Sequence, residues 1–419
     1  MTLGSKSRFR VLAPGPTLGD VARSHPYLGA AAALAVTAFV NHRLAAAAER
    51  RNPPTGKFVE VEGVFVHYVE EGDGEPLVLL HGNGSMLQDF ASSGLIAMVA
   101  KTYRVIAFDR PGYGHSKRPR STIWTAVAQA ELIEAALRKI GVSNAIVFGH
   151  SWGCSVAVAL ALRAPNLVRS LVLASGYYFP SVRTDVVTMS GPAVPVLGDA
   201  IRYTISPLLA RIMWPRLIRK MFRPAPVADN FQRGFPKEMT FRPSQIRASA
   251  AESALMIPGA VAARSRYGEL KMPVVILAGE QDRLIDINNQ SARLHSELPN
   301  STLHRLQGVG HMVHQTAPVA TMAAIDEAAS AQAFVRTNEP TTDEEVYAAR
   351  VMEILAEQVT RENDMILQAH LQPAMHKSGL SGPQFAAGLR YAIDIGQLEI
   401  ERNSYCISGS GKKQFNLPS

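Results

Sequence analysis

Cysteine is scarce in this sequence of 419 residues, which contains only Cys154 and Cys406. Because the two residues fall into different predicted domains, the sequence does not predict a disulfide framework. Neither cysteine belongs to a C-x-x-C motif or to a Cys/His cluster, so we predict no metal site. No cofactor is predicted either, since no motif for one is recognised. We therefore expect the chemistry to come from the chain's own side chains and backbone.

A hydrophobic run of the usual membrane-spanning length is also lacking. Residues 27–40 form an uncharged stretch of fourteen residues, whereas a spanning helix needs about 20. The apolar residues 44–48 would lengthen it. Three interpretations stay open: a membrane anchor or interfacial helix, a helix packed on the protein's own surface, and a cleaved signal peptide. We favour a membrane-associated protein, with a cytoplasmic one as the alternative.

The net charge of +8 is unevenly distributed along the chain. Residues 1–60 contain eight basic and three acidic residues, and residues 176–268 contain thirteen and five. Residues 339–419 contain seven basic and eleven acidic residues, a net charge of −4. An anionic membrane surface or substrate is therefore a possible partner for the first two regions only. The alternative is a solvated basic face without a partner.

Three parts of the chain differ in their patterns. Residues 1–55 form an N-terminal arm, which ends in a linker rich in helix breakers at 50–56. Residues 56–335 begin with a predicted hairpin and then alternate short apolar strands with amphipathic helices, which predicts a parallel sheet covered on both faces. Residues 340–419 follow a polar linker and form a third, smaller part.

The alternation of strands and helices stops at about residues 176–270, which are rich in proline and arginine and favour helices. An apolar stripe runs through residues 207–222, and we expect it to form core between this insertion and the sheet. The alternative is contact with a membrane surface, because basic residues are interleaved with aromatic ones. The stripe comprises Leu208, Leu209, Ile212, Met213, Leu217, Ile218, Met221 and Phe222.

The organising stretch of the sequence is residues 145–154, A-I-V-F-G-H-S-W-G-C. An apolar strand ends abruptly and a helix begins near Ser151, which places this serine at the apex of a sharp turn. Glycines at 149 and 153 leave room for neighbouring elements in the crowded turn because they lack a Cβ. We therefore expect Ser151 to be accessible to a substrate.

This G-x-S-x-G pattern between a strand and an apolar helix resembles the nucleophile elbow of the α/β-hydrolase fold. The resemblance covers about the middle two thirds of the chain and implies a mostly parallel, doubly wound sheet. It also implies that the insertion is a helical cap over the serine. The loop at 109–116 is of a type that supports the active-site floor in this family, so Asp109 is expected to be structural.

Two further polar residues follow predicted strands. Asp282 comes shortly after the strand at 274–278, and His311 follows the strand at 302–306. Carboxyl ends of parallel strands share one edge, so these side chains can meet Ser151. Their order is that of the α/β-hydrolase triad. His311 would take the serine proton, and Asp282 would orient the imidazole. His314 is the alternative base and Asp286 the alternative acid.

Backbone N–H groups are expected to bind the oxyanion of the tetrahedral intermediate. The predicted donors are those of Trp152, directly after the serine, and of Asn83, in the glycine-rich loop 81–84. Each such donor is typically worth about 3 kcal/mol. His81 and His150 flank the site, and we expect them to support loops rather than to react.

The His81-Gly82-Asn83 loop also resembles that of haloalkane dehalogenases and epoxide hydrolases, whose nucleophile is an aspartate. A serine attacking an alkyl carbon would leave an ether that water does not readily cleave. We therefore predict hydrolysis of a carboxylic ester or similar acyl bond in a fairly apolar small molecule. Alternatives are an amidase or aminopeptidase, a carbon–carbon bond hydrolase, a cofactor-free haloperoxidase, or a non-catalytic ligand-binding protein.

The C-terminal part shows helical spacing at 344–371 and 381–395 and then a predicted hairpin at 398–408. This order weakly resembles a winged helix, a small α+β domain. The negative charge of this part disfavours binding to nucleic acid, since phosphate contacts need a basic face. We therefore predict a module for protein contacts or oligomerisation.

Overall fold

The computed structural model describes residues 26–181, 186, 189–336, 342–356, 365–367, 371–394, 398–401 and 404–407. Its centre is an eight-stranded sheet of order β1-β2-β4-β3-β5-β6-β7-β8. The β1–β2 and β2–β4 pairs are antiparallel and the other pairs are parallel. The strands are β1 (Lys57–Val61), β2 (Val64–Glu71), β3 (Glu75–Leu80), β4 (Tyr103–Phe108), β5 (Ala145–His150), β6 (Val168–Ala174), β7 (Val274–Gly279) and β8 (Ser301–Leu306).

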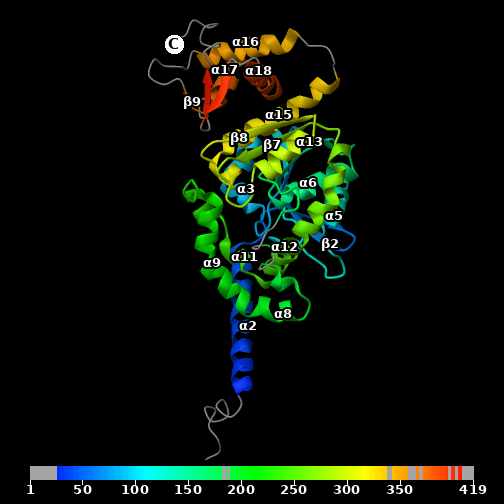
Figure 1. The fold of residues 1–419 in the computed structure, drawn as a ribbon, viewed down its shortest axis with the longest axis vertical. Helices are drawn as coiled ribbons and strands as arrows, with labels where there is room; N and C mark the ends of the chain where they lie inside the picture. The colour runs from blue at the N-terminus through cyan, green and yellow to red at the C-terminus, as the bar shows by residue number, and fades with distance from the viewer. Residues whose placement is uncertain are drawn as a thin grey trace, which may run out of the picture.

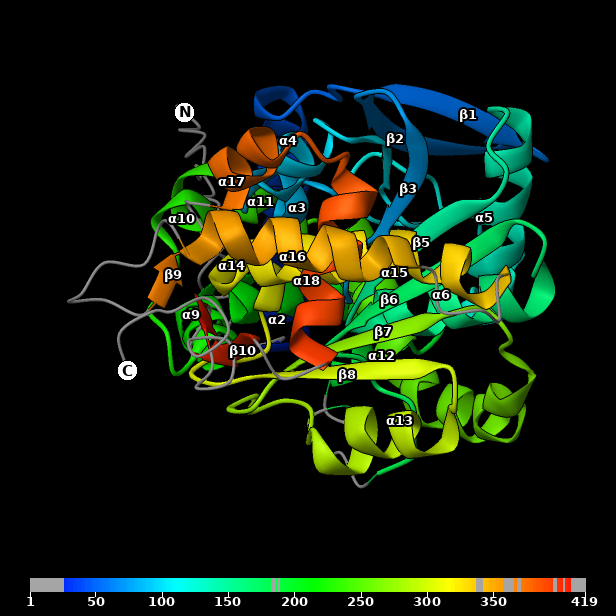
Figure 2. The same ribbon diagram turned by 90° about the horizontal axis from the view of Figure 1, so that it is seen from above.

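Helices cover both faces of this sheet, as Figure 2 shows. One face packs against α5 (Ala126–Lys139) and α6 (Trp152–Arg163). The other packs against α3 (Gln88–Ser92), α4 (Leu95–Val99) and α15 (Pro318–Arg336). Strands β5 and β7 are consequently buried along their whole length, which explains why their sequences are apolar without alternation. The predicted parallel, doubly covered sheet is confirmed.

Helices fill the insertion between β6 and β7, as predicted. They are η1 (Gly191–Ala193), α8 (Leu197–Tyr203), α9 (Ile205–Phe222), α10 (Asp229–Gly234), α11 (Lys237–Thr240), α12 (Pro243–Ala263) and η2 (Arg264–Glu269). In Figure 1, α8, α11 and α12 lie on the side of the sheet from which the N-terminal helix extends. This insertion is called the cap below.

The predicted core stripe of the cap is only partly correct. Ile218 and Phe222, near the end of α9, are buried among aromatic side chains of the cap. The earlier residues Leu208, Leu209, Ile212 and Met213 are exposed instead. The buried face of α9 is the one that carries Pro207, Ile218 and Phe222. Leu208, Leu209, Ile212 and Met213 point away from that face at about 3.6 residues per turn, so the predicted stripe is not the packed one.

The N-terminal helix α2 (Pro26–Arg51) is continuous through the polar residues that interrupt the apolar run. It extends from the body of the molecule (Figure 1), and its Tyr27–Arg51 segment is long and apolar enough to cross a membrane, by length and composition. Its later turns pack on the cap, where Asn41 Nδ2 donates to the carbonyl oxygens of Tyr203 and Thr204 at 2.9 and 2.8 Å. Because α2 ends at Arg51, the first two residues of the linker predicted at 50–56 belong to the last turn of this helix.

The short helix α13 (Arg293–Glu297) lies between β7 and β8, and the short helix α14 (Val313–Thr316) follows β8. The last helices of the hydrolase are α14 and α15, and Pro318 is the first residue of α15.

The C-terminal part contains α16 (Thr342–Ala356), β9 (Met365–Leu367), α17 (Leu371–Ser378), α18 (Gly382–Asp394), β10 (Leu398–Glu401) and β11 (Ser404–Ile407). The predicted hairpin is present as β10 and β11. The helix predicted over 344–371 is wrong in its second half, because residues 365–367 pair with β11 as a strand. This part lies at the end of the molecule opposite α2 (Figure 1). The resemblance to a winged helix stays a prediction, and the polar linker lies largely outside the described residues.

Candidate active site

Ser151 connects β5 to α6 in a strained conformation. Its backbone has φ 53° and ψ −118°, a region that residues other than glycine rarely adopt. A Cβ on Gly149 would lie 2.7 Å from the backbone of Gly153, and a Cβ on Gly153 would lie 2.1 Å from the carbonyl oxygen of Leu80. The expected need for glycines on both sides of the serine is confirmed.

The three predicted triad side chains lie together at the carboxyl edge of the sheet. His311 Nε2 is 3.1 Å from Ser151 Oγ, and His311 Nδ1 is 2.7 Å from Asp282 Oδ2. The other oxygen of Asp282 accepts the backbone N–H groups of Leu284 and Ile285 at 2.7 and 3.0 Å. Both carboxylate oxygens are thus occupied, so the acid holds the imidazole in one orientation.

The two alternative residues have other partners. His314 is buried, and its Nε2 lies 3.1 Å from Asp89 Oδ1. Asp286 is exposed, and its Oδ1 accepts the backbone N–H of Asn289 at 2.9 Å. Neither side chain joins the hydrogen-bonded chain that starts at Ser151.

His150 supports the backbone of the neighbouring histidine, since its Nε2 lies 3.0 Å from the carbonyl oxygen of His311. Burial and the nearby His314 and His311 keep the pKa of His150 well below its usual value, so the ring is neutral. Asp89, His150 and His314 offer ligand atoms within 4.8 Å of one another, the spacing of a metal site. Gln315 Nε2 already donates to Asp89 Oδ1 at 2.8 Å, which favours a packed polar cluster.

The glycine-rich loop after β3 passes directly beside the serine. A Cβ on Gly82 would lie 3.1 Å from Ser151 Cβ. Trp152 is the first residue of α6, so its N–H has no carbonyl one turn earlier in the helix. The side chain of Asn83 is held by Ser249 O and Ser253 Oγ, each 3.2 Å from its Nδ2. Both predicted oxyanion donors therefore lie on segments next to the serine.

Asp109 and His81 lie behind this loop. Asp109 is completely buried, and its carboxylate accepts the N–H groups of Leu87 and His115 at 3.0 Å each. His81 Nε2 accepts the backbone N–H of Arg110, also at 3.0 Å. Burial, together with the charge of Arg110, lowers the pKa of His81 to about 4. The expectation that Asp109 and His81 are supporting groups agrees with these contacts.

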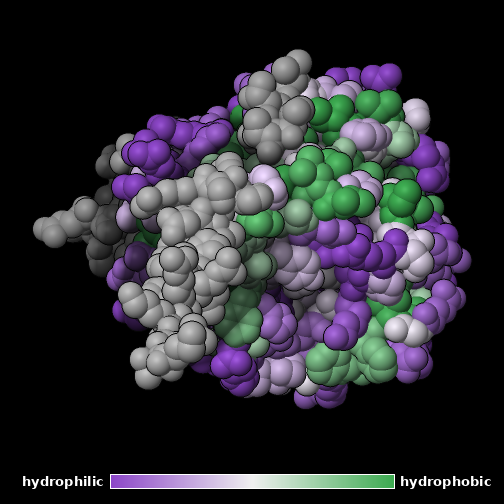
Figure 3. Space-filling view, turned by 90° about the horizontal axis from the view of Figure 1, so that it is seen from below, coloured by the Kyte–Doolittle hydropathy of each residue, from purple (hydrophilic) through white to green (hydrophobic). Residues whose placement is uncertain are grey.

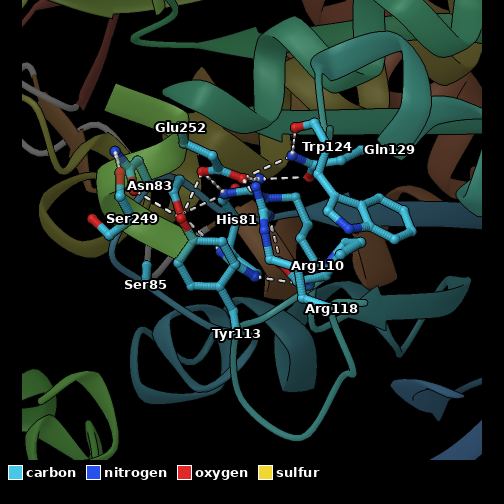
Figure 4. Close-up of polar contacts among 12 residues, drawn as sticks. His81, Asn83, Ser85, Arg110, Tyr113, Arg118, Trp124, Gln129, Ser249 and Glu252 are labelled. Atoms are coloured by element: carbon cyan, nitrogen blue, oxygen red, sulfur yellow. Dashed lines mark hydrogen bonds and ion pairs between the residues drawn. The ribbon is translucent and has the colours of Figure 1, made fainter. Parts of the chain in front are cut away.

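A buried polar network around Arg110 and Glu252, shown in Figure 4, was not predicted from the sequence. Arg110 Nη1 donates to Glu252 Oε1 at 2.5 Å and to Gln129 Oε1 at 2.8 Å. Gln129 Nε2 in turn donates to Glu252 Oε1 at 2.8 Å. A signal was present in the D-R-P-G turn, where an arginine follows a buried strand, but its partner lies 142 residues away.

Comparison with known proteins places this geometry in a family. The family described as alpha/beta hydrolase fold matches residues 75–318. The uncharacterised hydrolase YugF of Bacillus subtilis is 27% identical over 263 residues, which cover 62% of this chain and 92% of that protein. Haloalkane dehalogenase 2 of Mycobacterium tuberculosis is 25% identical over 272 residues, 62% of this chain and 90% of the relative. A 2-hydroxy-6-oxononadienedioate/2-hydroxy-6-oxononatrienedioate hydrolase of Paraburkholderia phymatum is 29% identical over 277 residues, 61% and 89% of the two chains.

Solved structures show the same fold at low identity. An enol-lactonase from Burkholderia xenovorans LB400 has a TM-score of 0.53 and 18% identity, with 65% of this chain and all 100% of that chain covered. A bacterial membrane phospholipase A has a TM-score of 0.51 and 22% identity, with 74% and 96% covered. Since the family match spans more than half of the sequence and the sheet carries the expected elbow, the chain belongs to the α/β-hydrolase fold family.

Proposed function

We propose that the protein hydrolyses a carboxylic ester, or a similar acyl bond, of a fairly apolar substrate. The observation that carries this proposal is the continuous hydrogen-bonded chain from Ser151 Oγ through His311 to Asp282. A base in contact with the hydroxyl and an acid in contact with the base are what a serine needs to act as a nucleophile.

In the first half of the reaction, Ser151 Oγ attacks the acyl carbon while His311 Nε2 takes the serine proton. Asp282 stabilises the imidazolium that forms, and the N–H groups of Asn83 and Trp152 bind the oxyanion. The leaving group departs with the proton from His311, and the acyl group stays on the serine. Water then attacks this acyl-enzyme in the same way and releases the acid.

A carbon–carbon bond next to a carbonyl is the second candidate for the bond cleaved. The similarity to a 2-hydroxy-6-oxononadienedioate hydrolase supports it. Similarity to a haloalkane dehalogenase is weaker support for dehalogenation, because this chain carries a serine at the elbow and not an aspartate. Amide cleavage, cofactor-free haloperoxidation and ligand binding without turnover remain further alternatives.

The test combines labelling with a substrate panel. A fluorophosphonate should label the wild-type chain and should leave Ser151→Ala unlabelled. The wild type should hydrolyse p-nitrophenyl esters of increasing acyl length, and its kcat/KM should be highest for an ester whose acyl chain is longer than the shortest ones. Ser151→Ala should hydrolyse none of them. Absence of both labelling and hydrolysis in the folded wild type would contradict acyl transfer and favour a ligand-binding protein.

We also propose that α2 attaches the protein to a membrane. Its middle turns expose large apolar side chains, including Leu34, Val36 and Phe39, which are 45%, 63% and 64% exposed. The cap helix α9 also exposes apolar residues, and Figure 3 shows hydrophobic patches on the end of the molecule from which α2 extends. Residues 27–40 cover about 21 Å as a helix, so a cap resting on the bilayer would complete the membrane contact.

Fractionation of cells without detergent tests the attachment. The wild type should sediment with membranes, whereas a variant with glutamine at Leu34, Val36 and Phe39 should be soluble. Phe58→Gln with Phe65→Gln is the matched control, because these residues are similarly exposed on the sheet. A wild type that is soluble with its N-terminus intact would contradict the proposal, and a mature chain without residues 1–40 would indicate a signal peptide.

The C-terminal part is proposed to mediate protein contacts. It packs against the hydrolase through α15 and α18, where Ser330 Oγ donates to the carbonyl oxygen of Pro383 at 3.1 Å. Its net charge of −4 favours a basic protein surface over nucleic acid. Salt-dependent retardation of duplex DNA by the full chain would contradict this assignment.

A further inference from the structure

A completely buried ion pair connects the cap to the sheet beside the candidate active site (Figure 4). Arg110 lies two residues after the end of β4, the strand next to β3, and Glu252 belongs to the cap helix α12. Their two contacts measure 2.5 Å from Nη1 to Oε1 and 3.1 Å from Nη2 to Oε2, and both side chains are 0% exposed. This bidentate geometry fixes the plane of the guanidinium as well as its position.

The same guanidinium holds two carbonyl groups of the loop at residues 81–84. Its Nε donates to the carbonyl oxygen of His81 at 2.7 Å, and its Nη2 donates to that of Gly82 at 2.9 Å. In the described part of the chain, the cis peptide bond is Arg223–Pro224, so the bond between Gly82 and Asn83 is trans. The C=O and N–H of a trans peptide point in opposite directions. Because the Gly82 carbonyl faces Arg110, the Asn83 N–H faces away from it.

A second connection links α12 to the side chain of the same asparagine. The hydroxyl of Tyr113 lies 2.7 Å from Glu252 Oε2 and 2.8 Å from Asn83 Oδ1. Asn83 Nδ2 donates to the carbonyl oxygen of Ser249 in α12. The residue that carries the predicted oxyanion donor is therefore tied to the cap through both its backbone and its side chain.

The charges of the pair make this connection difficult to break. Burial opposes ionisation of Glu252, but the charge and hydrogen bonds of Arg110 outweigh it, and the pKa of Glu252 lies below its usual value. Separating the cap from the sheet would break this ion pair and would take from both charges their buried hydrogen-bond partners. The network is thus intact only while α12 is seated on the sheet.

We propose that Arg110, Tyr113 and Glu252 are positioning residues that hold the Asn83 N–H in place to bind the oxyanion. The proposal rests on the acyl hydrolysis proposed for Ser151. It gives the cap a part in stabilising the transition state, because one of its own glutamates completes the support of the oxyanion loop.

The main test is Glu252→Gln in the full-length chain, with activity expressed per serine titrated by a fluorophosphonate. Glutamine keeps the shape of the side chain and removes its charge. We expect kcat for a p-nitrophenyl ester to fall about 10-fold to 100-fold and KM to change less than about 3-fold, since the oxyanion is bound only in the transition state. Glu238→Gln is the matched control, because Glu238 forms a partly exposed cap ion pair with Arg211 at 3.3 Å. It should keep wild-type values.

Inhibition by an alkyl boronic acid separates positioning from a merely structural role. Boron accepts Ser151 Oγ to give an anionic tetrahedral adduct, and the serine proton moves to His311. The Ki should rise in Glu252→Gln by the same factor as kcat/KM falls. If Glu252→Gln does not fold, Tyr113→Phe removes one hydroxyl from the network and should change both quantities about 5-fold. Wild-type kcat and Ki in a folded variant would overturn the proposal, whereas a wild type inactive on every ester would contradict the proposed function instead.

Discussion

His311 and Asp282 face each other with 2.7 Å between Nδ1 and Oδ2, and each side chain is only 4% exposed. Asp282→Asn would keep the acceptor for the N–H groups of Leu284 and Ile285 while removing the charge that stabilises the imidazolium. We expect kcat for a p-nitrophenyl ester to fall about 10³-fold to 10⁴-fold with little change in folding. Asp286→Asn is the control, because Asp286 is the exposed alternative acid, and this variant should keep its activity. Equal losses in both variants would contradict the assignment of the acid.

The elbow gives a prediction about stability. Gly153→Ala should cost about 3 kcal/mol, because the new Cβ would lie 2.1 Å from the carbonyl oxygen of Leu80, where neither backbone can retreat. Gly259→Ala is the control, since no atom lies within 4 Å of its added Cβ, and the better helix former should stabilise α12 by about 1 kcal/mol. Thermal unfolding of the two variants measures both effects. A melting temperature of Gly153→Ala equal to that of the wild type would show that the elbow is less crowded than described.

Acid should destabilise the protein through His81. The folded-state pKa of about 4 lies below the usual value of 6.5, so the unfolded chain binds more protons between these values and stability falls as the pH is lowered. For this residue alone the loss is about 2 kcal/mol at pH 5 relative to pH 8. His81→Gln keeps an acceptor for the Arg110 N–H and does not titrate. Urea unfolding at the two pH values should therefore show a smaller acid loss in the variant than in the wild type, and equal losses would refute the prediction.

Asp326 should act in the opposite direction. Burial raises the pKa of this carboxyl to about 7, even though the Tyr103 hydroxyl, 2.6 Å from Oδ1, favours the charged form. The folded state therefore binds more protons than the unfolded state between pH 4 and pH 7, and stability is lost as the pH rises through this range. Asp326→Asn keeps an oxygen for Tyr103 and should gain about 3 kcal/mol relative to the wild type between pH 5 and pH 8. Urea unfolding at these two pH values measures the difference, and parallel pH profiles would contradict it.

The order of the elements could be predicted because its signals are local. The apolar runs of β5 and β7 read as buried strands, and Gly149 and Gly153 mark the elbow without reference to the rest of the chain. The wrong predictions depend on distant partners. The sequence of α9 is apolar on more than one face, and which face is buried depends on where the other cap helices lie, so Pro207, Ile218 and Phe222 are buried while Leu208 and Ile212 are exposed. Residues 365–367 form a strand only because β11 lies beside them.

By itself, the sequence determined the strand–helix alternation, the elbow at Ser151 and the placement of Asp282 and His311 after strands, since periodicity and turn residues are properties of short segments. Only the tertiary structure decided that His311, and not His314, contacts Ser151, because both histidines follow the same strand and differ only in the direction they face. Only the tertiary structure paired Arg110 with Glu252, since packing brings together charges whose separation of 142 residues has no periodic signature.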